Sequence, residues 1–205
     1  HYRKKFHIPK NSEGDEWLYF TGNSLGLQPK ETKNHIKQEL DDWANLGVEG
    51  HFEAKNPWMP YHEFLTETMA QIVGAKPIEV VIMNTLTTNL HLLMVSFYQP
   101  TKLKHKILIE SDAFPSDRYA VETQLKFHGF DPSDSLIEWS PRKGETLLNI
   151  EDLESILESQ GEEIALLLIG GVNYYTGQYL DLKKISQLGR RKGCKVGIDL
   201  AHGVG

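Results

Sequence analysis

The sequence lacks the features that would mark an exported, membrane-bound or nucleic-acid-binding protein. Its 205 residues contain a single cysteine, so no internal disulfide can form and a reducing cytoplasm is the expected location. The longest apolar run, Ile164–Val172, is far shorter than the ~20 residues of a transmembrane helix. The formal net charge is −6 without a basic stripe, so we expect neither nucleic acid nor a membrane as a partner.

Motifs for several common cofactors are also missing. No G-x-G-x-x-G follows a predicted strand and no G-x-x-x-x-G-K-[ST] occurs, which removes the strongest nucleotide-binding signals. The nine histidines are dispersed without close ligand spacing, so no metal site is expected. Cys194 stands at a strand entrance, where we expect a buried structural thiol rather than a nucleophile. With no signal peptide and no initiator methionine, the chain is expected to be part of a larger protein.

The pattern of apolar residues divides the chain in two. Residues 1–74 are predicted to form an N-terminal helical segment, with helices over 31–46 and 63–73 and a short strand over 17–20. Residues 75–205 alternate short apolar strands with amphipathic helices, which predicts an α/β fold with a mainly parallel sheet covered by helices on both faces. The predicted strands are 79–83, 106–109, 135–139, 164–169 and 195–199, and the predicted helices are 87–97, 116–127, 150–159 and 182–191.

In such sheets ligands bind beyond the carboxyl ends of the strands, so the residues that follow each strand are candidate site residues. After 79–83, the hydroxyl groups of Thr85, Thr87 and Thr88 and the free backbone N–H groups near Leu86 gather where a helix begins. Unpaired N–H groups and the helix dipole both favour an anion there. Taken alone, this stretch favours an ordinary threonine N-cap over an anion site.

The segment after 106–109 places an aromatic residue beside a proline. Pro115 keeps Phe114 extended, where its ring can cover a flat ligand, and Ser116 or Asp117 can cap the following helix. A core phenylalanine next to a plain N-cap is the alternative. The segment after 164–169 begins with Gly170, a residue that permits close approach of the backbone.

The last predicted strand ends on Asp199, with His202 three residues later. An aspartate at this place needs a cationic or hydrogen-bond-donating partner, because otherwise burial raises its pKa; it also suits a cap of the next turn. A phosphate cradle, an aromatic lid and a strand-end carboxylate together suit pyridoxal 5′-phosphate (PLP). Asp199 would keep the ring nitrogen protonated, so that the ring can accept electrons from a carbanion.

Five segments are similar to the kynureninase family of fold-type-I PLP enzymes and occur in family order from Tyr19 to Gly205. They are YFTGNSLGLQP, NTLTTNLHLLM, AFPSDRYAVETQL, YYTGQYLDL and VGIDLAHGVG. The resemblance implies that residues 75–205 are the first part of an aspartate aminotransferase-like large domain, ending before the Schiff-base lysine. It implies hydrolysis of L-kynurenine or 3-hydroxy-L-kynurenine to an anthranilate and L-alanine, in tryptophan catabolism, by a homodimer.

Carried over by position, the resemblance implies roles for individual residues. Leu86 and Thr87 would hold the cofactor phosphate, and Phe114 would stack on the ring. Asp199 would pair with the ring nitrogen as the main catalytic group with His202, and Asp117 would support it. The implied cofactor shell consists of Leu86, Thr87, Phe114, Pro115, Ser116, Asp117, Gly170, Asp199 and His202; Ser24 and His51 would reach the substrate, with Trp58 near the loop of His51.

The chain departs from the family pattern at one position, because the family usually carries a serine or threonine where Gly170 stands. Two other interpretations remain open at this point. A cysteine desulfurase or aminotransferase of the same fold would be expected to stack a histidine where Phe114 stands. A non-catalytic domain of the fold would have no lysine on a polar turn after Asp199; both His51 and His202 also suit structural roles.

Overall fold

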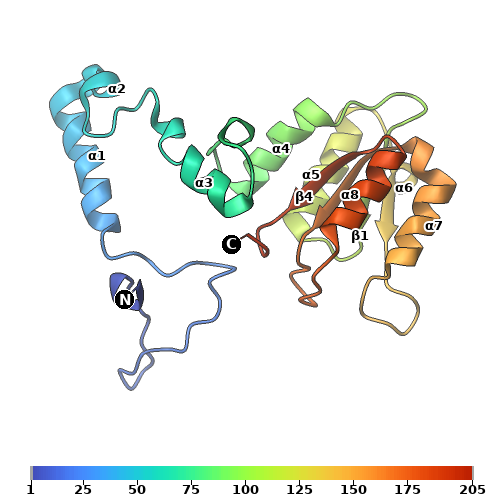
Figure 1. Cartoon of the computed structure of the whole chain (residues 1–205), viewed down its shortest axis with the longest axis horizontal. Helices are drawn as coiled ribbons and strands as arrows, with labels where there is room; N and C mark the ends of the chain where they lie inside the picture. The colour runs from blue at the N-terminus through green and yellow to red at the C-terminus, as the bar shows by residue number, and fades with distance from the viewer. Residues whose placement is uncertain (1, 205) are drawn as a thin grey trace. The chain divides into compact units, whose positions relative to one another are not determined.

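The computed structural model describes residues 2–204, which form two compact units, one ending at Met83 and the other spanning Asn84–Val204 (Figure 1). Residues 1 and 205, the outer bounds of the two predicted segments, lie outside the described residues. Over the described part of the chain, no helix is both long and apolar enough to cross a membrane.

The first unit is built from short helices joined by loops. Its longest helix covers the predicted range 31–46 closely and ends at Gly47, whose φ of 55° is a conformation that glycine adopts readily. The next predicted helix is shorter than expected and ends at Gly74 in the left-handed conformation. The elements are η1 (Tyr2–Lys5), α1 (Thr32–Leu46), η2 (Gly47–Glu49), α2 (Gly50–Glu53), η3 (Tyr61–Glu63), α3 (Thr66–Val73) and η4 (Pro77–Glu79).

Two predicted strands of this part, 17–20 and 79–83, are wrong. Residues 17–20 have no regular secondary structure; they follow a single bridge from Lys10 to Glu16 and have no buried face to pack. At 79–83 the chain first turns as η4, where the Glu79 carboxylate accepts a 2.8 Å hydrogen bond from the Lys76 N–H. Local capping therefore competes with strand pairing there, and the following extended residues find no ladder partner among residues 2–204.

The second unit contains a four-stranded parallel sheet in the order β2-β1-β3-β4. Its four strands match the predicted strands after 83 to within one residue, so the predicted parallel α/β fold is confirmed. The elements are α4 (Leu86–Phe97), β1 (Lys106–Glu110), α5 (Pro115–Phe127), α6 (Pro132–Ser135), β2 (Leu136–Trp139), α7 (Ile150–Gln160), η5 (Gly161–Glu163), β3 (Ile164–Gly170), α8 (Leu182–Arg191) and β4 (Lys195–Asp199).

Helices cover both faces of this sheet because successive side chains of a strand point to opposite sides. On β1, Ile107 and Ile109 pack with α4 and α5, whereas Leu108 packs with α7 and α8. These three side chains are at most 1% exposed. The fully apolar strands of the sequence therefore correspond to a sheet buried on both faces, as Figure 1 shows for the layers around β1 and β4.

Polar residues set the starts of two helices that connect the strands. The Asn149 side chain accepts a hydrogen bond from the Glu151 N–H at the start of α7, and Asp181 accepts one from the Lys184 N–H at the start of α8. These caps fix where each helix begins and, with it, the length of the connection back to the sheet.

The connections that leave β1 and β3 diverge. The helix after β1 is α5, on one face of the sheet, and the helix after β3 is α8, on the other. Since β1 and β3 are neighbours, the chain leaves their carboxyl ends toward opposite faces of the sheet, and ligands bind at such points in parallel sheets. This switch point positions the candidate site.

Candidate active site

Two aspartates from different elements meet at the carboxyl end of the sheet. Asp117 lies in the first turn of α5 and is 7% exposed, and Asp199 is the last residue of β4. Their carboxyl groups are within hydrogen-bonding reach of each other. Burial, that hydrogen bond and the charge of Asp199 raise the pKa of Asp117 to about 7, against the weaker effect of a hydrogen bond from the Ser116 hydroxyl.

A third carboxyl group, that of Glu110 at the end of β1, lies in the same place. Glu110 is 5% exposed, and its two carboxylate oxygens accept the Gly170 N–H at 3.0 and 3.2 Å. Burial raises the pKa of Glu110, hydrogen bonds from the backbone N–H groups of Glu110 and Gly170 lower it, and the charge of Asp199 raises it further. Its side chain therefore reaches from the end of β1 to the end of β3.

The three carboxyl groups have no basic partner within residues 2–204. None of the eight ion pairs found there includes Glu110, Asp117 or Asp199. The same residues contain no group of three or more potential ligands placed to hold a metal ion. Buried carboxyl groups without a cation are costly, and a cationic organic group would relieve that cost. This donor set fits a protonated pyridine ring.

Asp199 also caps the next turn, the alternative role that the sequence suggested for it. Its Oδ1 accepts a 2.7 Å hydrogen bond from the Ala201 N–H, so it caps the turn that follows β4. That turn carries His202, which is half-buried. One carboxylate oxygen thus fixes the backbone after the strand, while the carboxyl group still reaches Asp117.

The start of α5 differs from the predicted cap. The helix begins at Pro115, and the N-cap residue is Phe114, so Ser116 and Asp117 are inside the first turn and cap nothing. Proline suits the first helical position, because its missing N–H would be unpaired there. Phe114 is extended, as predicted, and its ring lies edge-on to that of Tyr174, with centroids 5.1 Å apart.

The start of α4 keeps its backbone donors free of side-chain caps. Thr85 is the N-cap residue, yet its hydroxyl makes no capping bond and lies 3.2 Å from the hydroxyl of Thr88. The ordinary threonine N-cap is therefore wrong. Leu86 and Thr87 open the helix, Thr87 half-buried, with backbone N–H groups that have no partner within the helix.

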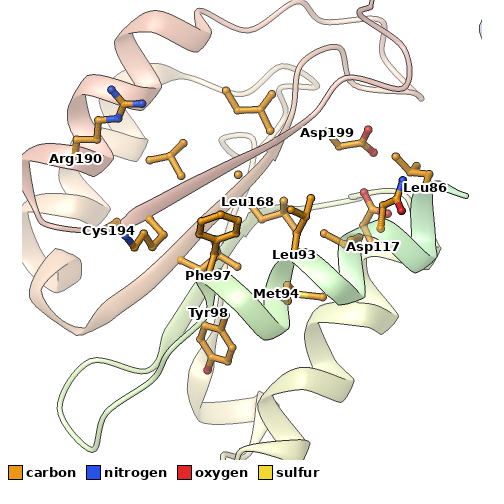
Figure 2. Close-up of a pocket in the computed structure, with 17 residues that line it drawn as sticks. Leu86, Leu93, Met94, Phe97, Tyr98, Asp117, Leu168, Arg190, Cys194 and Asp199 are labelled. Atoms are coloured by element: carbon orange, nitrogen blue, oxygen red, sulfur yellow. The ribbon is translucent and has the colours of Figure 1, made fainter. Parts of the chain in front are cut away.

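A cavity of about 550 Å³ lies between α4 and the face of β3 and β4. Figure 2 shows Asp117, Asp199 and Leu86 together at one end of it, while Arg190 and Cys194 lie at the other. Apolar side chains of α4 and the sheet line most of the remainder. The cavity is therefore largely apolar, with an acidic group at one end and Arg190 at the other. Cys194 is buried, and burial raises the pKa of its thiol, as a structural cysteine requires.

Gly170 is the last residue of β3, and its neighbour explains why it has no side chain. A Cβ built there would lie 2.8 Å from Oε1 of Glu110. The Gly170 N–H is already used by that carboxylate. Glu110 and Gly170 therefore depend on each other sterically and through a hydrogen bond.

Ser24 and His51 belong to the first unit and are described there alone. Ser24 is exposed in a turn, where its N–H donates to the Thr21 carbonyl at 3.0 Å. His51 is exposed, with Nδ1 2.8 Å from the Val48 carbonyl and its ring edge-on to Trp58 at 5.4 Å. Nδ1 is thus engaged by the backbone, and Nε2 makes no hydrogen bond within residues 2–204.

Sequence reasoning missed three residues of this site. Glu110 ends the apolar strand KILIE as Asp199 ends KVGID, so the same signal was present. Asn89 lines the cavity, and its buried Oδ1 has no partner among the described residues; only its place one turn into the helix could have suggested it. Tyr174 was visible as half of an aromatic pair in a loop after a strand.

Comparison with known proteins gives a consistent picture. The family model for aminotransferase class-V matches residues 18–205. The chain is 55% identical over 204 residues to the curated kynureninase of Koribacter versatilis, covering 100% of this chain and 48% of that protein. It is 46% identical over 216 residues to the kynureninase of Mus musculus, covering 100% and 47%. The chain thus spans about half the length of the curated relatives it matches.

Among solved structures, a C-DES mutant with glycine covalently linked to its PLP cofactor matches with a TM-score of 0.72 and 16% identity, over 90% of this chain and 47% of that one. The cysteine desulfurase of Thermococcus onnurineus matches with a TM-score of 0.65 and 18% identity, over 89% and 43%. At these identities the matches establish the fold, which is that of the fold-type-I enzymes predicted from the sequence.

Proposed function

Because the chain belongs to the aminotransferase class-V family, we propose that it is part of a PLP-dependent enzyme that hydrolyses L-kynurenine or 3-hydroxy-L-kynurenine. The products are anthranilate, or its 3-hydroxy form, and L-alanine. The observation that carries this proposal is the similarity to curated kynureninases along the whole chain, at 55% identity for one of them against 18% for a cysteine desulfurase of the same fold. Phe114, where the desulfurase interpretation expects histidine, supports the same choice.

The acidic end of the cavity would receive the ring of the cofactor. When bound, the protonated ring supplies an electron sink for the carbon–carbon bond cleavage. Asp199 holds the proton on the ring nitrogen, and Asp117 adds negative charge from the first turn of α5. A charge pair at ~4 Å in an effective dielectric near 20 supplies roughly 4 kcal/mol before desolvation, which is more than enough to keep that proton.

Other residues of the second unit would orient and enclose the cofactor. The uncapped N–H groups at Leu86 and Thr87 bind the phosphate, because unpaired donors and the helix dipole both favour an anion. Phe114 covers the ring and is held by its edge-on contact with Tyr174. Pro115 and Ser116 shape the turn beneath, and His202 closes the shell after β4.

We also propose that Ser24 and His51 reach the substrate and that the full-length protein is a cytoplasmic homodimer. Support for the substrate residues comes from the similarity to kynureninases and from the free Nε2 of His51. The absence of disulfide-forming cysteine pairs supports a reducing compartment. Light scattering of the purified protein would measure the oligomeric state directly.

A substrate comparison on the full-length protein that contains this chain tests the proposed function. The protein is stripped of cofactor, and anthranilate release from L-kynurenine is followed by fluorescence with and without added PLP. L-Cysteine is assayed in parallel for sulfide release. We expect PLP-dependent anthranilate formation and little sulfide. Sulfide release without kynurenine cleavage would replace the proposal with a desulfurase, and neither activity would refute both.

A further inference from the structure

Glu110 lies at the switch point, where the connections that follow β1 and β3 run to opposite faces of the sheet. Its side chain crosses from the end of β1 to the Gly170 N–H at the end of β3, and Gly170 is in register with Asp199 on β4. We propose that Glu110 is a positioning residue that acts through Asp199 to strengthen the hold of this site on the ring-nitrogen proton. The inference deepens the proposed function and rests on it.

The charged surroundings of Glu110 come from three elements. Asp199 on β4 and Asp117 on α5 are the titratable groups that interact with it, and the N–H groups of Glu110 and Gly170 stabilise its ionised form. Lysine, arginine and histidine side chains within residues 2–204 form no ion pair with it. Its electrostatic influence therefore falls on the two aspartates.

A structural explanation of Glu110 accounts for the hydrogen bond and leaves the charge unexplained. A glutamine carbonyl would accept the Gly170 N–H equally well without adding a third carboxyl group to a buried acidic cluster. In the absence of a cation the charge is unfavourable, since Asp199 raises the pKa of Glu110. With a pyridinium ring against Asp199, the same charge becomes favourable because it makes the Asp199 carboxylate a stronger acceptor of the ring proton.

The ring nitrogen itself provides the test. The full-length protein is loaded with PLP labelled with ¹⁵N in the ring, and the ¹⁵N chemical shift is measured against pH for wild type and Glu110→Gln. Glutamine preserves the side-chain length and an acceptor for Gly170 and removes one charge. We expect the pKa of the ring nitrogen to fall by about one unit in the variant, since a unit charge at ~10 Å in a protein interior acts with that strength.

Glu138→Gln is the matched control. Glu138 lies on β2 of the same sheet, and its carboxylate pairs with Arg118 instead of facing other carboxyl groups unpaired. This substitution also removes one negative charge from the sheet, but from a side chain whose charge is already paired with Arg118. The ring-nitrogen pKa should therefore match that of wild type. Thermal unfolding is measured for all three proteins. A lower melting temperature of Glu110→Gln with an unchanged ring-nitrogen pKa would overturn the proposal, because Glu110 would then be only structural.

Gly170→Ala provides a second route to the same answer if Glu110→Gln does not fold. Gly170 does not have a positive φ, so alanine is permitted by the backbone, but its Cβ would force the Glu110 carboxylate away from a 2.8 Å contact. The ring-nitrogen pKa should again fall, and an unchanged value would refute the role of Glu110. If the wild-type protein binds no PLP, the proposed function itself is refuted. If it binds PLP normally but the variants have the wild-type ring-nitrogen pKa, only this inference is refuted.

Discussion

The carboxyl group of Asp117, in the first turn of α5, lies within hydrogen-bonding reach of the carboxyl group of Asp199 at the end of β4. The two residues come from opposite sides of the switch point of the sheet. Their proximity creates an acidic site, buried at Asp117, without a basic partner in the described part of the chain. The first two predictions concern this pair.

The stability of the cofactor-free protein should fall as the pH rises from about 4 to about 7. The pKa of Asp117 is raised from 3.8 to about 7 on folding, so the folded state binds the proton more tightly than the unfolded state. The stabilisation that this provides is complete below pH 3.8 and is lost as the pH passes through about 7. Asp117→Asn should flatten this part of the profile and gain about 1–2 kcal/mol at pH 8, allowing for solvent screening. Urea unfolding of both proteins across pH 4–8 measures their free energies of unfolding. If these free energies change with pH in parallel for the two proteins, the prediction is contradicted.

Asp199→Asn should reduce turnover by about 100-fold or more while cofactor affinity changes much less. Asparagine retains an oxygen for the Ala201 N–H, so the turn after β4 survives and only the charge is lost. The phosphate contacts at α4 are unaffected. Steady-state kinetics and PLP titration separate the two effects, with substitution of Asp134, an exposed residue of α6, by alanine as control. Near-normal turnover would rule out an electronic role for Asp199.

Thr87→Ala should weaken PLP binding by about 5–10-fold, the value of one lost hydrogen bond to phosphate. Thr88→Ala is the matched control, because Thr88 is exposed one residue later and its hydroxyl faces Thr85. The dissociation constant of PLP is measured by absorbance titration of the stripped full-length protein. Equal affinities for the two variants would remove Thr87 from the phosphate site.

Gly50→Ala should destabilise the first unit by about 1–3 kcal/mol through overpacking. A Cβ at Gly50 would lie 2.3–2.8 Å from the ring of Trp58, which is fixed by a 3.0 Å hydrogen bond from its indole N–H to Glu39. Gly26→Ala, with nothing within 4 Å of the added carbon, is the control. Chemical unfolding followed by tryptophan fluorescence compares them, and equal midpoints would mean that the ring moves freely.

Local pattern predicted the second unit well and the first unit less well. The strands now defined as β1, β2, β3 and β4 are apolar enough to be recognised without knowledge of their partners. The failures at 17–20 and 79–83 are segments for which nothing in the described chain supplies a ladder. A strand depends on pairing with distant residues, whereas a capped turn such as η4 forms from its own side chains.

The sequence by itself determined which kinds of side chain follow the strands: Phe114 before a proline, threonines at the start of α4, and Asp199 at the end of the last strand. Only the tertiary structure decided which of them meet. The parallel register aligns Gly170 with Asp199, and α5 and α8 diverge at the point where Glu110 reaches from β1 to β3. These contacts join residues far apart along the chain, so they follow from sheet order and crossover direction, which no local pattern of residues records.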